Sequence, residues 1–167
     1  AYNLPQGTLS QLYRDIAAHK LGTLTHVGMN TFADPRIEGG KLNDVTTEDI
    51  VEVVEVLGEE RLLYKAQKFD IGFIRGSYAD ENGNVTLEHE CCTTEATSIA
   101  QAVKNCGGKV VVQVEKVVQD GCVDPKLVKI PGIYVDAIVV CEHKEAHAQC
   151  QGCEYAGSMT GAFRVPL

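Results

Sequence analysis

The protein has 167 residues, with 44% hydrophobic and 23% charged side chains, a balance typical of a folded globular chain rather than a disordered or fibrous one. Its formal net charge of -8 and its scattered Lys and Arg residues offer no basic surface to a phosphate backbone, so we expect no nucleic-acid partner. The longest apolar runs are too short for a membrane span and no secretory pattern opens the chain, so we expect a cytoplasmic protein with no membrane partner.

Two segments carry the apolar spacing of amphipathic helices. From Pro5 to Ala18, apolar residues recur at i, i+3, i+4, i+7 and i+8 behind a proline that suits a first helical turn. The same spacing runs from about Thr94 to Asn105, where Gly107 and Gly108 supply a stop. We therefore predict a helix in each segment, the second with one face against a sheet.

Short runs of β-branched residues predict strands at 50–56, 62–64, 69–74, 110–114 and 133–140. The last run is apolar at nearly every position, which is typical of a strand buried on both faces. Together with the helices, these runs predict an α/β fold with a mixed, largely parallel sheet and flanking helices. Between them, Asp80–Asn84 fits a hairpin turn with Gly83 at a positive φ.

The organisation of the chain is unusual at both ends. A doubly wound domain usually opens with a strand and a glycine-rich turn, whereas this chain opens on Ala1–Pro5 and a helix, so we expect the first strand of the sheet to be missing. After Val140 the composition becomes polar and rich in His, Gln and Cys. We predict that residues 1–141 form the core of one partial α/β domain and that 142–167 form a polar Cys/His-rich segment and linker toward a second domain.

Six motifs occur in an order and spacing that resemble one known family. They are Leu4–Leu9 (LPQGTL), Thr25–Phe32 (THVGMNTF), Asp34–Asn43 (DPRIEGGKLN), Ala79–Val85 (ADENGNV), Pro131–Asp136 and Gly161–Leu167 (GAFRVPL). Together they resemble the N-terminal-type domain of class I coenzyme A transferases, closest to the propionate and acetate CoA-transferases. The resemblance covers essentially the whole chain and is weakest over residues 142–158.

The resemblance implies a part of an enzyme that moves coenzyme A between short-chain acyl-CoA and carboxylic acids. In that chemistry a glutamate carboxylate attacks the thioester and holds CoA as a glutamyl thioester until a second acid collects it. We expect the family's Gly-Phe motif, which follows its first strand, to lie before Ala1, and its Ser-Glu-Asn-Gly motif, which carries the nucleophile, to lie after Leu167. Glu38 and Glu154 lie beside or near glycine but lack the family's flanking residues, so we assign no catalytic residue to this chain.

The implied substrate is CoA as acyl-CoA, with a carboxylic acid as the second substrate and no metal. The isolated chain is expected to be inactive. We expect it to associate with the remaining part of the transferase or a companion subunit, and to form a homo-oligomer, because a truncated sheet exposes an unpaired edge and apolar surface.

The resemblance also implies substrate-binding residues. Gln6 matches the glutamine of the family's Pro-Gln-Gly motif, which faces the active site at a helix start. Its alternative role is that of an N-terminal capping residue in a solvated turn. Gly28, Asn30 and Thr31 match a strand-to-loop junction that lines the acyl pocket in the family. The same residues fit equally well a tight turn stabilised by local side-chain hydrogen bonds.

Gly39, Gly40 and Lys41 combine flexible backbone amides with a cation, which suggests binding of the CoA phosphates. This segment lacks the fuller spacing of a P-loop, and the alternative is a simple turn with an exposed lysine.

The cysteines and histidines give a rival hypothesis. Cys141 precedes His143, His147, Cys150 and Cys153, whose His-x3-His and Cys-x2-Cys spacings occur in zinc sites. The alternative function is therefore a non-catalytic binding or assembly module with a zinc site in this tail, and the other interpretation is a thiol-rich surface loop. Cys91 and Cys92 are adjacent and too constrained to bridge easily with each other, and the odd total of seven cysteines favours reduced thiols.

Overall fold

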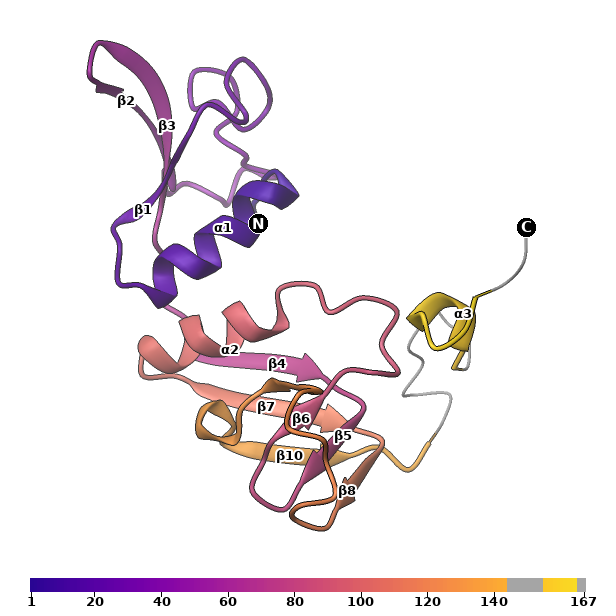
Figure 1. The fold of residues 1–167 in the computed structure, drawn as a ribbon. Coiled ribbons are helices and arrows are strands. Elements are labelled where there is room, and N and C mark those ends of the chain that lie inside the picture. The colour runs from indigo at the N-terminus through magenta and orange to yellow at the C-terminus, as the bar shows by residue number, and fades with distance from the viewer. Residues whose placement is uncertain (144–154, 165–167) are drawn as a thin grey trace. The chain divides into compact units, whose positions relative to one another are not determined.

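The computed structural model describes residues 1–143 and 155–164. The chain divides into two compact units, Ala1–Lys68 and Phe69–Leu167, which are described separately (Figure 1). The predicted division between residues 141 and 142 stays a prediction. Helices, a parallel sheet, an antiparallel sheet and a mixed sheet all occur among the described residues, so the predicted α/β class is confirmed.

The first unit consists of one helix and a three-stranded antiparallel sheet. Helix α1 (Gln6–Ala17) confirms the first predicted helix, and strands β1 (Gly22–Thr25), β2 (Val51–Val56) and β3 (Glu59–Lys65) lie in the order β1-β3-β2. A two-residue turn joins β2 to β3, with Leu57 and Gly58 at φ of 56° and 80°, as a tight hairpin with the twist of its strands requires. Strand β1 was not predicted because its four residues carry only one large apolar side chain.

A buried carboxylate connects helix α1 to the sheet. Asp15 on the helix accepts hydrogen bonds from Thr23 Oγ1 on β1 at 2.7 Å and from Lys20 Nζ at 2.7 Å. The apolar core of this unit comes from one face of α1 and from the inward side chains of the sheet, including Leu12, Ile16, Val51, Leu62 and Tyr64.

The second unit contains two sheets and the second predicted helix. Strands β4 (Ile71–Arg75), β7 (Lys109–Val114) and β10 (Ala137–Val140) form a parallel sheet in the order β10-β7-β4. Strands β5 (Tyr78–Asp80), β6 (Val85–Thr86), β8 (Lys116–Val118) and β9 (Val128–Ile130) form the other, in the order β8-β5-β6-β9. The shorter helical elements are η1 (Gly132–Tyr134) and α3 (Gly157–Thr160).

Helix α2 (Ala96–Asn105) packs against the parallel sheet (Figure 1). It ends as predicted, because Gly107 takes φ of 79° and the Gly108 N–H donates to Val103 O at 2.9 Å. Gly72 on β4 permits this packing, since a Cβ there would meet the Val103 side chain. The core between helix and sheets contains Ile74, Ala79, Val85, Leu87, Ala96, Ala100, Val103, Val110, Val112, Val114 and Ile130.

The prediction of a strand buried on both faces at 133–140 is wrong. Pro131 precedes the short helix η1, strand β10 begins only at Ala137, and Ile133 is 78% exposed. Strand β10 is an edge strand of its sheet, and Val139 and Val140 are exposed on it. An apolar run alone could not separate an edge strand from a central one. The predicted turn at Gly83 is confirmed, with φ of 84°.

Strands β4 and β10 are the two edges of the parallel sheet among the described residues. Ile71 and Phe73 on β4 are exposed, and Phe73 is 78% exposed. No helix in the described part of the chain is both long and apolar enough to cross a membrane.

Candidate functional site

Apart from Gln6 at the start of helix α1, the predicted site residues of the first unit lie in one compact loop, residues 28–41. Several residues in it have positive φ, namely Gly28 at 96°, Asn30 at 60°, Gly39 at 63° and Gly40 at 72°. A Cβ on Gly28 would meet the hydroxyl of Tyr64, which itself donates to Val27 O at 2.9 Å. The loop is therefore tightly folded, and glycine at position 28 is a steric requirement.

An ion pair with a buried carboxylate holds this loop. The carboxylate of Asp34 is fully buried and accepts hydrogen bonds from the backbone N–H groups of Asn30 at 2.9 Å and Arg36 at 3.0 Å. The Arg36 guanidinium donates to the same carboxylate through Nε at 3.0 Å and Nη2 at 2.8 Å. These bonds from Arg36 hold the pKa of Asp34 well below its usual range, so Asp34 is ionised at neutral pH.

The loop lies beside the segment that leads into helix α1. Asn3 N–H donates to Gly40 O at 2.7 Å, and Leu42 N–H donates to Ala1 O at 3.0 Å. A Cβ on Gly40 would meet the backbone oxygen of Asn3, so only glycine allows this approach. The fold thus brings Gly39–Lys41 next to the turn that starts the Gln6 helix, which the sequence alone did not predict.

The predicted substrate-binding side chains differ in how they are used. Gln6 and Asn30 are exposed, so both are accessible to a ligand. Thr31 Oγ1 donates to Gly28 O at 2.7 Å and accepts from Ala33 N–H at 3.3 Å. The hydroxyl of Thr31 therefore stabilises the turn, which agrees with the structural alternative for this residue. A binding role for any of these residues stays a prediction.

Lys41 is engaged in a salt bridge. Its Nζ lies 2.6 Å from Asp49 Oδ1 and donates to Thr47 O at 3.2 Å. A CoA phosphate would have to compete with the Asp49 carboxylate for this ammonium. Glu38, which we rejected as the nucleophile, is exposed, and its backbone N–H donates to Asp34 O at 3.1 Å.

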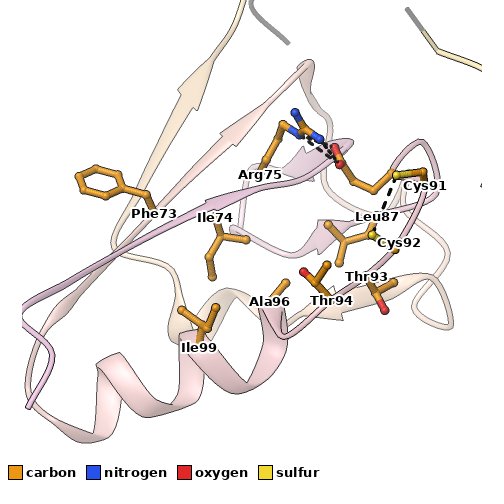
Figure 2. Close-up of a pocket in the computed structure, with 11 residues that line it drawn as sticks. Phe73, Ile74, Arg75, Leu87, Cys91, Cys92, Thr93, Thr94, Ala96 and Ile99 are labelled. Carbon is orange, nitrogen blue, oxygen red and sulfur yellow. Dashed lines mark hydrogen bonds and ion pairs between the residues drawn. The ribbon is translucent and has the colours of Figure 1, made fainter. Parts of the chain in front are cut away.

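The second unit holds a cavity of about 260 Å³ beside strand β4 and the start of helix α2 (Figure 2). Ile74, Leu87, Ala96 and Ile99 give it an apolar floor. Polar side chains and thiols complete the wall, contributed by Arg75, Glu90, Cys91, Cys92, Thr93 and Thr94, and Phe73 also lines it.

An ion pair closes one side of this cavity. Arg75 donates through Nε to Glu90 Oε1 at 3.0 Å and through Nη2 to Glu90 Oε2 at 2.7 Å (Figure 2). The bidentate geometry compensates both charges, so the cavity favours a small apolar group rather than a strongly charged one. The sequence did not predict this cavity, because its walls come from segments more than ten residues apart without a shared motif.

The predicted metal ligands are mostly outside the described residues. His143 is exposed, and His147, Cys150 and Cys153 fall within residues 144–154, which the structure does not describe. The described residues contain no group of three or more His, Cys, Asp or Glu side chains that could hold a metal ion. The zinc hypothesis for the tail therefore stays a prediction.

Comparison with known proteins identifies the class. A family model described as Coenzyme A transferase matches residues 1–141, so the chain belongs to the coenzyme A transferase family. The resemblance to class I CoA-transferases inferred from the six motifs is confirmed.

The chain is similar to two curated CoA-transferases. It is 51% identical over 164 residues to caffeate CoA-transferase of Acetobacterium woodii, covering 98% of this chain and 31% of that protein. It is 49% identical over 140 residues to acetate CoA-transferase YdiF of Escherichia coli K12, covering 84% of this chain and 26% of that protein. The chain thus spans about a third or less of the length of these relatives.

A solved structure shares the fold. The thioester complex with CoA of the acyl-CoA transferase YdiF from E. coli O157:H7 matches with a TM-score of 0.90 and 44% identity. The match covers 99% of this chain and 34% of the YdiF chain.

Proposed function

We propose that residues 1–141 form part of a CoA-transferase that moves coenzyme A between a short-chain acyl-CoA and a carboxylic acid. The family match over these residues carries the proposal, and the 44% identical relative solved as a CoA thioester supports CoA as the substrate. The nucleophilic glutamate belongs to polypeptide other than these 167 residues. The chain supplies a wall of the site rather than the attacking group.

The loop at 28–41 and the start of helix α1 are the proposed contribution to that wall. A carboxylate is a weak nucleophile in water, so the reaction needs a site that excludes solvent and aims N–H donors at the tetrahedral oxyanion. Gln6 offers an exposed side-chain amide at a helix start, and Asn30 offers a second amide from a loop held rigid by Asp34. Both amides are suited to donate to a developing negative charge.

A chimera tests this function. The segment of the E. coli acetate CoA-transferase that matches this chain is replaced by residues 1–141, and CoA transfer from acetyl-CoA to propionate is measured. We expect transfer in the chimera and none with residues 1–167 alone. A chimera that folds and assembles like the E. coli enzyme but transfers no CoA contradicts the proposal.

Substitutions in the active chimera test the residues. Gln6→Ala and Asn30→Ala are expected to lower kcat by about 10²-fold if each amide stabilises the oxyanion. Gln119→Ala is the matched control, because Gln119 is an exposed amide of the second unit, and its kcat should be unchanged. Equal kcat values for all three variants would remove Gln6 and Asn30 from the site.

The proposed phosphate contact of Gly39–Lys41 has its own test. Lys41→Ala should raise the KM for acyl-CoA without changing kcat if the ammonium binds a phosphate in the complex. Asp49→Asn should then lower the KM, because it frees Lys41 from its salt bridge. If both variants leave the KM unchanged, Lys41 is a structural residue only.

The acid that receives the coenzyme A is proposed from the names of the relatives. The two relatives act, by their names, with caffeate and acetate and have nearly equal identity to this chain, so the chimera should be assayed with both acids.

The exposed Ile71 and Phe73 on an edge strand support association with further polypeptide or a second copy. Light scattering of the purified chain should therefore give a mass above that of the monomer.

A further inference from the structure

The cavity of the second unit carries two neighbouring thiols at its wall. Cys91 Sγ and Cys92 Sγ are 4.0 Å apart, and both side chains are exposed (Figure 2). None of the five described cysteines forms a disulfide. The pair therefore presents two reduced sulfur atoms side by side to solvent and to the cavity.

The sulfur separation suits chelation better than a disulfide. A disulfide needs its sulfur atoms about 2.05 Å apart, which adjacent residues reach only with strain. A pyramidal trivalent centre with two bonds to sulfur of about 2.3 Å, at an angle of about 100° to each other, holds its sulfurs about 3.5 Å apart, so the observed 4.0 Å must close by about 0.5 Å. A small side-chain rotation therefore brings the pair to the spacing of a bridged chelate, whereas a disulfide needs a much larger change.

The number of sulfur ligands selects the kind of centre. Structural zinc requires four ligands, and the described residues contain no group of three or more that could hold a metal ion. A monosubstituted trivalent arsenical needs two sulfurs, since its third position carries an organic group. The two sulfurs of this pair match the ligand number of the arsenical rather than that of zinc.

The adjoining cavity suits that organic group. It is partly open to solvent, and its volume of about 260 Å³ leaves room for a phenyl ring, since closed engineered cavities of about 150 Å³ hold benzene. Its floor is formed by Ile74, Leu87, Ala96 and Ile99, and the thiols lie in its wall. A phenyl group could thus occupy the cavity while the arsenic atom bonds to the sulfurs.

We propose that Cys91 and Cys92 form a dithiol site that chelates a monosubstituted trivalent arsenical, with its organic group in the adjoining cavity. In this step, R–As=O and two thiols give R–As(S)2 and water. Two As–S bonds form, the As–O and both S–H bonds break, and the oxygen leaves as water with both thiol protons. No atom is oxidised or reduced, so no further reactant is needed. The hydrogen bond with Cys91 raises the pKa of Cys92, so that thiol holds its proton at neutral pH until the condensation removes it.

Phenylarsine oxide is the probe, with mass spectrometry of the intact chain as the measurement. Cys150 and Cys153 have dithiol spacing and lie outside the described residues, so both are first changed to Ser. In this background we expect one adduct per chain, absent after either Cys91→Ser or Cys92→Ser and retained after Cys106→Ser or Cys122→Ser. No adduct in the background, or an adduct that survives Cys91→Ser, overturns the proposal.

Two further measurements separate chelation from other outcomes. A chelate resists an excess of monothiol and is removed by a dithiol, whereas removal by the monothiol would overturn a two-sulfur site. The phenyl compound should bind about tenfold more tightly than its methyl analogue if the ring is buried in the cavity. Equal affinities would overturn the role of the cavity. Unchanged circular dichroism confirms that each Ser variant is folded, and none of these results depends on transferase activity.

Discussion

Replacing Asp34 by Asn should loosen the loop at 28–41 and destabilise the first unit. Asp34 is 0% exposed, and its two carboxylate oxygens accept four N–H donors from Asn30 and Arg36. Asparagine has nearly the same shape but turns one of these oxygens into an NH2 group. That group would face either the two donors at Oδ2 or the two at Oδ1, so two hydrogen bonds are lost in either orientation.

The size of the effect follows from these bonds. A hydrogen bond to a charged group contributes about 1.5 to 3 kcal/mol, and two lost bonds would cost about 3 to 6 kcal/mol. The Arg36 side chain is 46% exposed, so water compensates part of the loss on its side. We therefore expect Asp34→Asn to lower the free energy of unfolding by about 3 kcal/mol.

Urea unfolding followed by circular dichroism measures this change, and hydrogen exchange of the Asn30 and Arg36 amides localises it. Asp44→Asn is the matched control, because Asp44 is an exposed carboxylate of the same unit, and its effect should stay below about 0.5 kcal/mol. An Asp34→Asn variant as stable as the control, with unchanged amide protection, would refute the role assigned to this carboxylate.

Three further predictions concern steric fit, packing and pH. Gly28→Ala should lower the free energy of unfolding by about 2 to 3 kcal/mol, because φ is 96° and the new Cβ meets Tyr64. Gly58→Ala, with open space around the new Cβ, should lower it by about 1 kcal/mol, and the urea midpoints of the two variants provide the comparison. Val112→Ala should lower the free energy of unfolding by about 2 kcal/mol, because it leaves a cavity in the core of the second unit. Val45→Ala, at an 87% exposed site, should lower it by less than about 0.5 kcal/mol. Equal thermal midpoints of the two variants would contradict this. Acid should destabilise the chain below about pH 4. The pKa of Asp34, paired with Arg36, and the pKa of Asp136, which accepts from the Val110 N–H, are both lowered in the folded state, so the unfolded state binds protons first as the pH falls. A urea midpoint that is constant from pH 7 to pH 3 would exclude this linkage.

Both long helices could be predicted from the sequence because helical spacing is a local property. Residues one turn apart decide whether a segment has an apolar face, and α1 and α2 lie within one or two residues of their expected limits. The glycine stop after α2 is also local, since it needs only a positive φ at Gly107. The shorter strands β5, β6, β8 and β9 were missed, because two or three residues carry no usable periodicity and depend on their partners.

Membership of the CoA-transferase family was likewise readable from the order of six short motifs. The motifs also placed Gly28–Thr31 at a strand-to-loop junction and Gly39–Lys41 in a loop, and glycine at 28 and 40 has a steric reason in the structure. They could not show that Asp34 binds Arg36 inside this loop, that Lys41 is paired with Asp49, or that Asn3 lies against Gly40.

The fold class, the two long helices and the family could be predicted from local patterns, since each depends on residues close together in the chain or on a fixed order of motifs. Tertiary structure alone decided which strands are edges and which side chains enclose the cavity beside Cys91 and Cys92. Strand pairing and burial join residues far apart in the chain, and the free energy that selects among pairings comes from packing that no local pattern records.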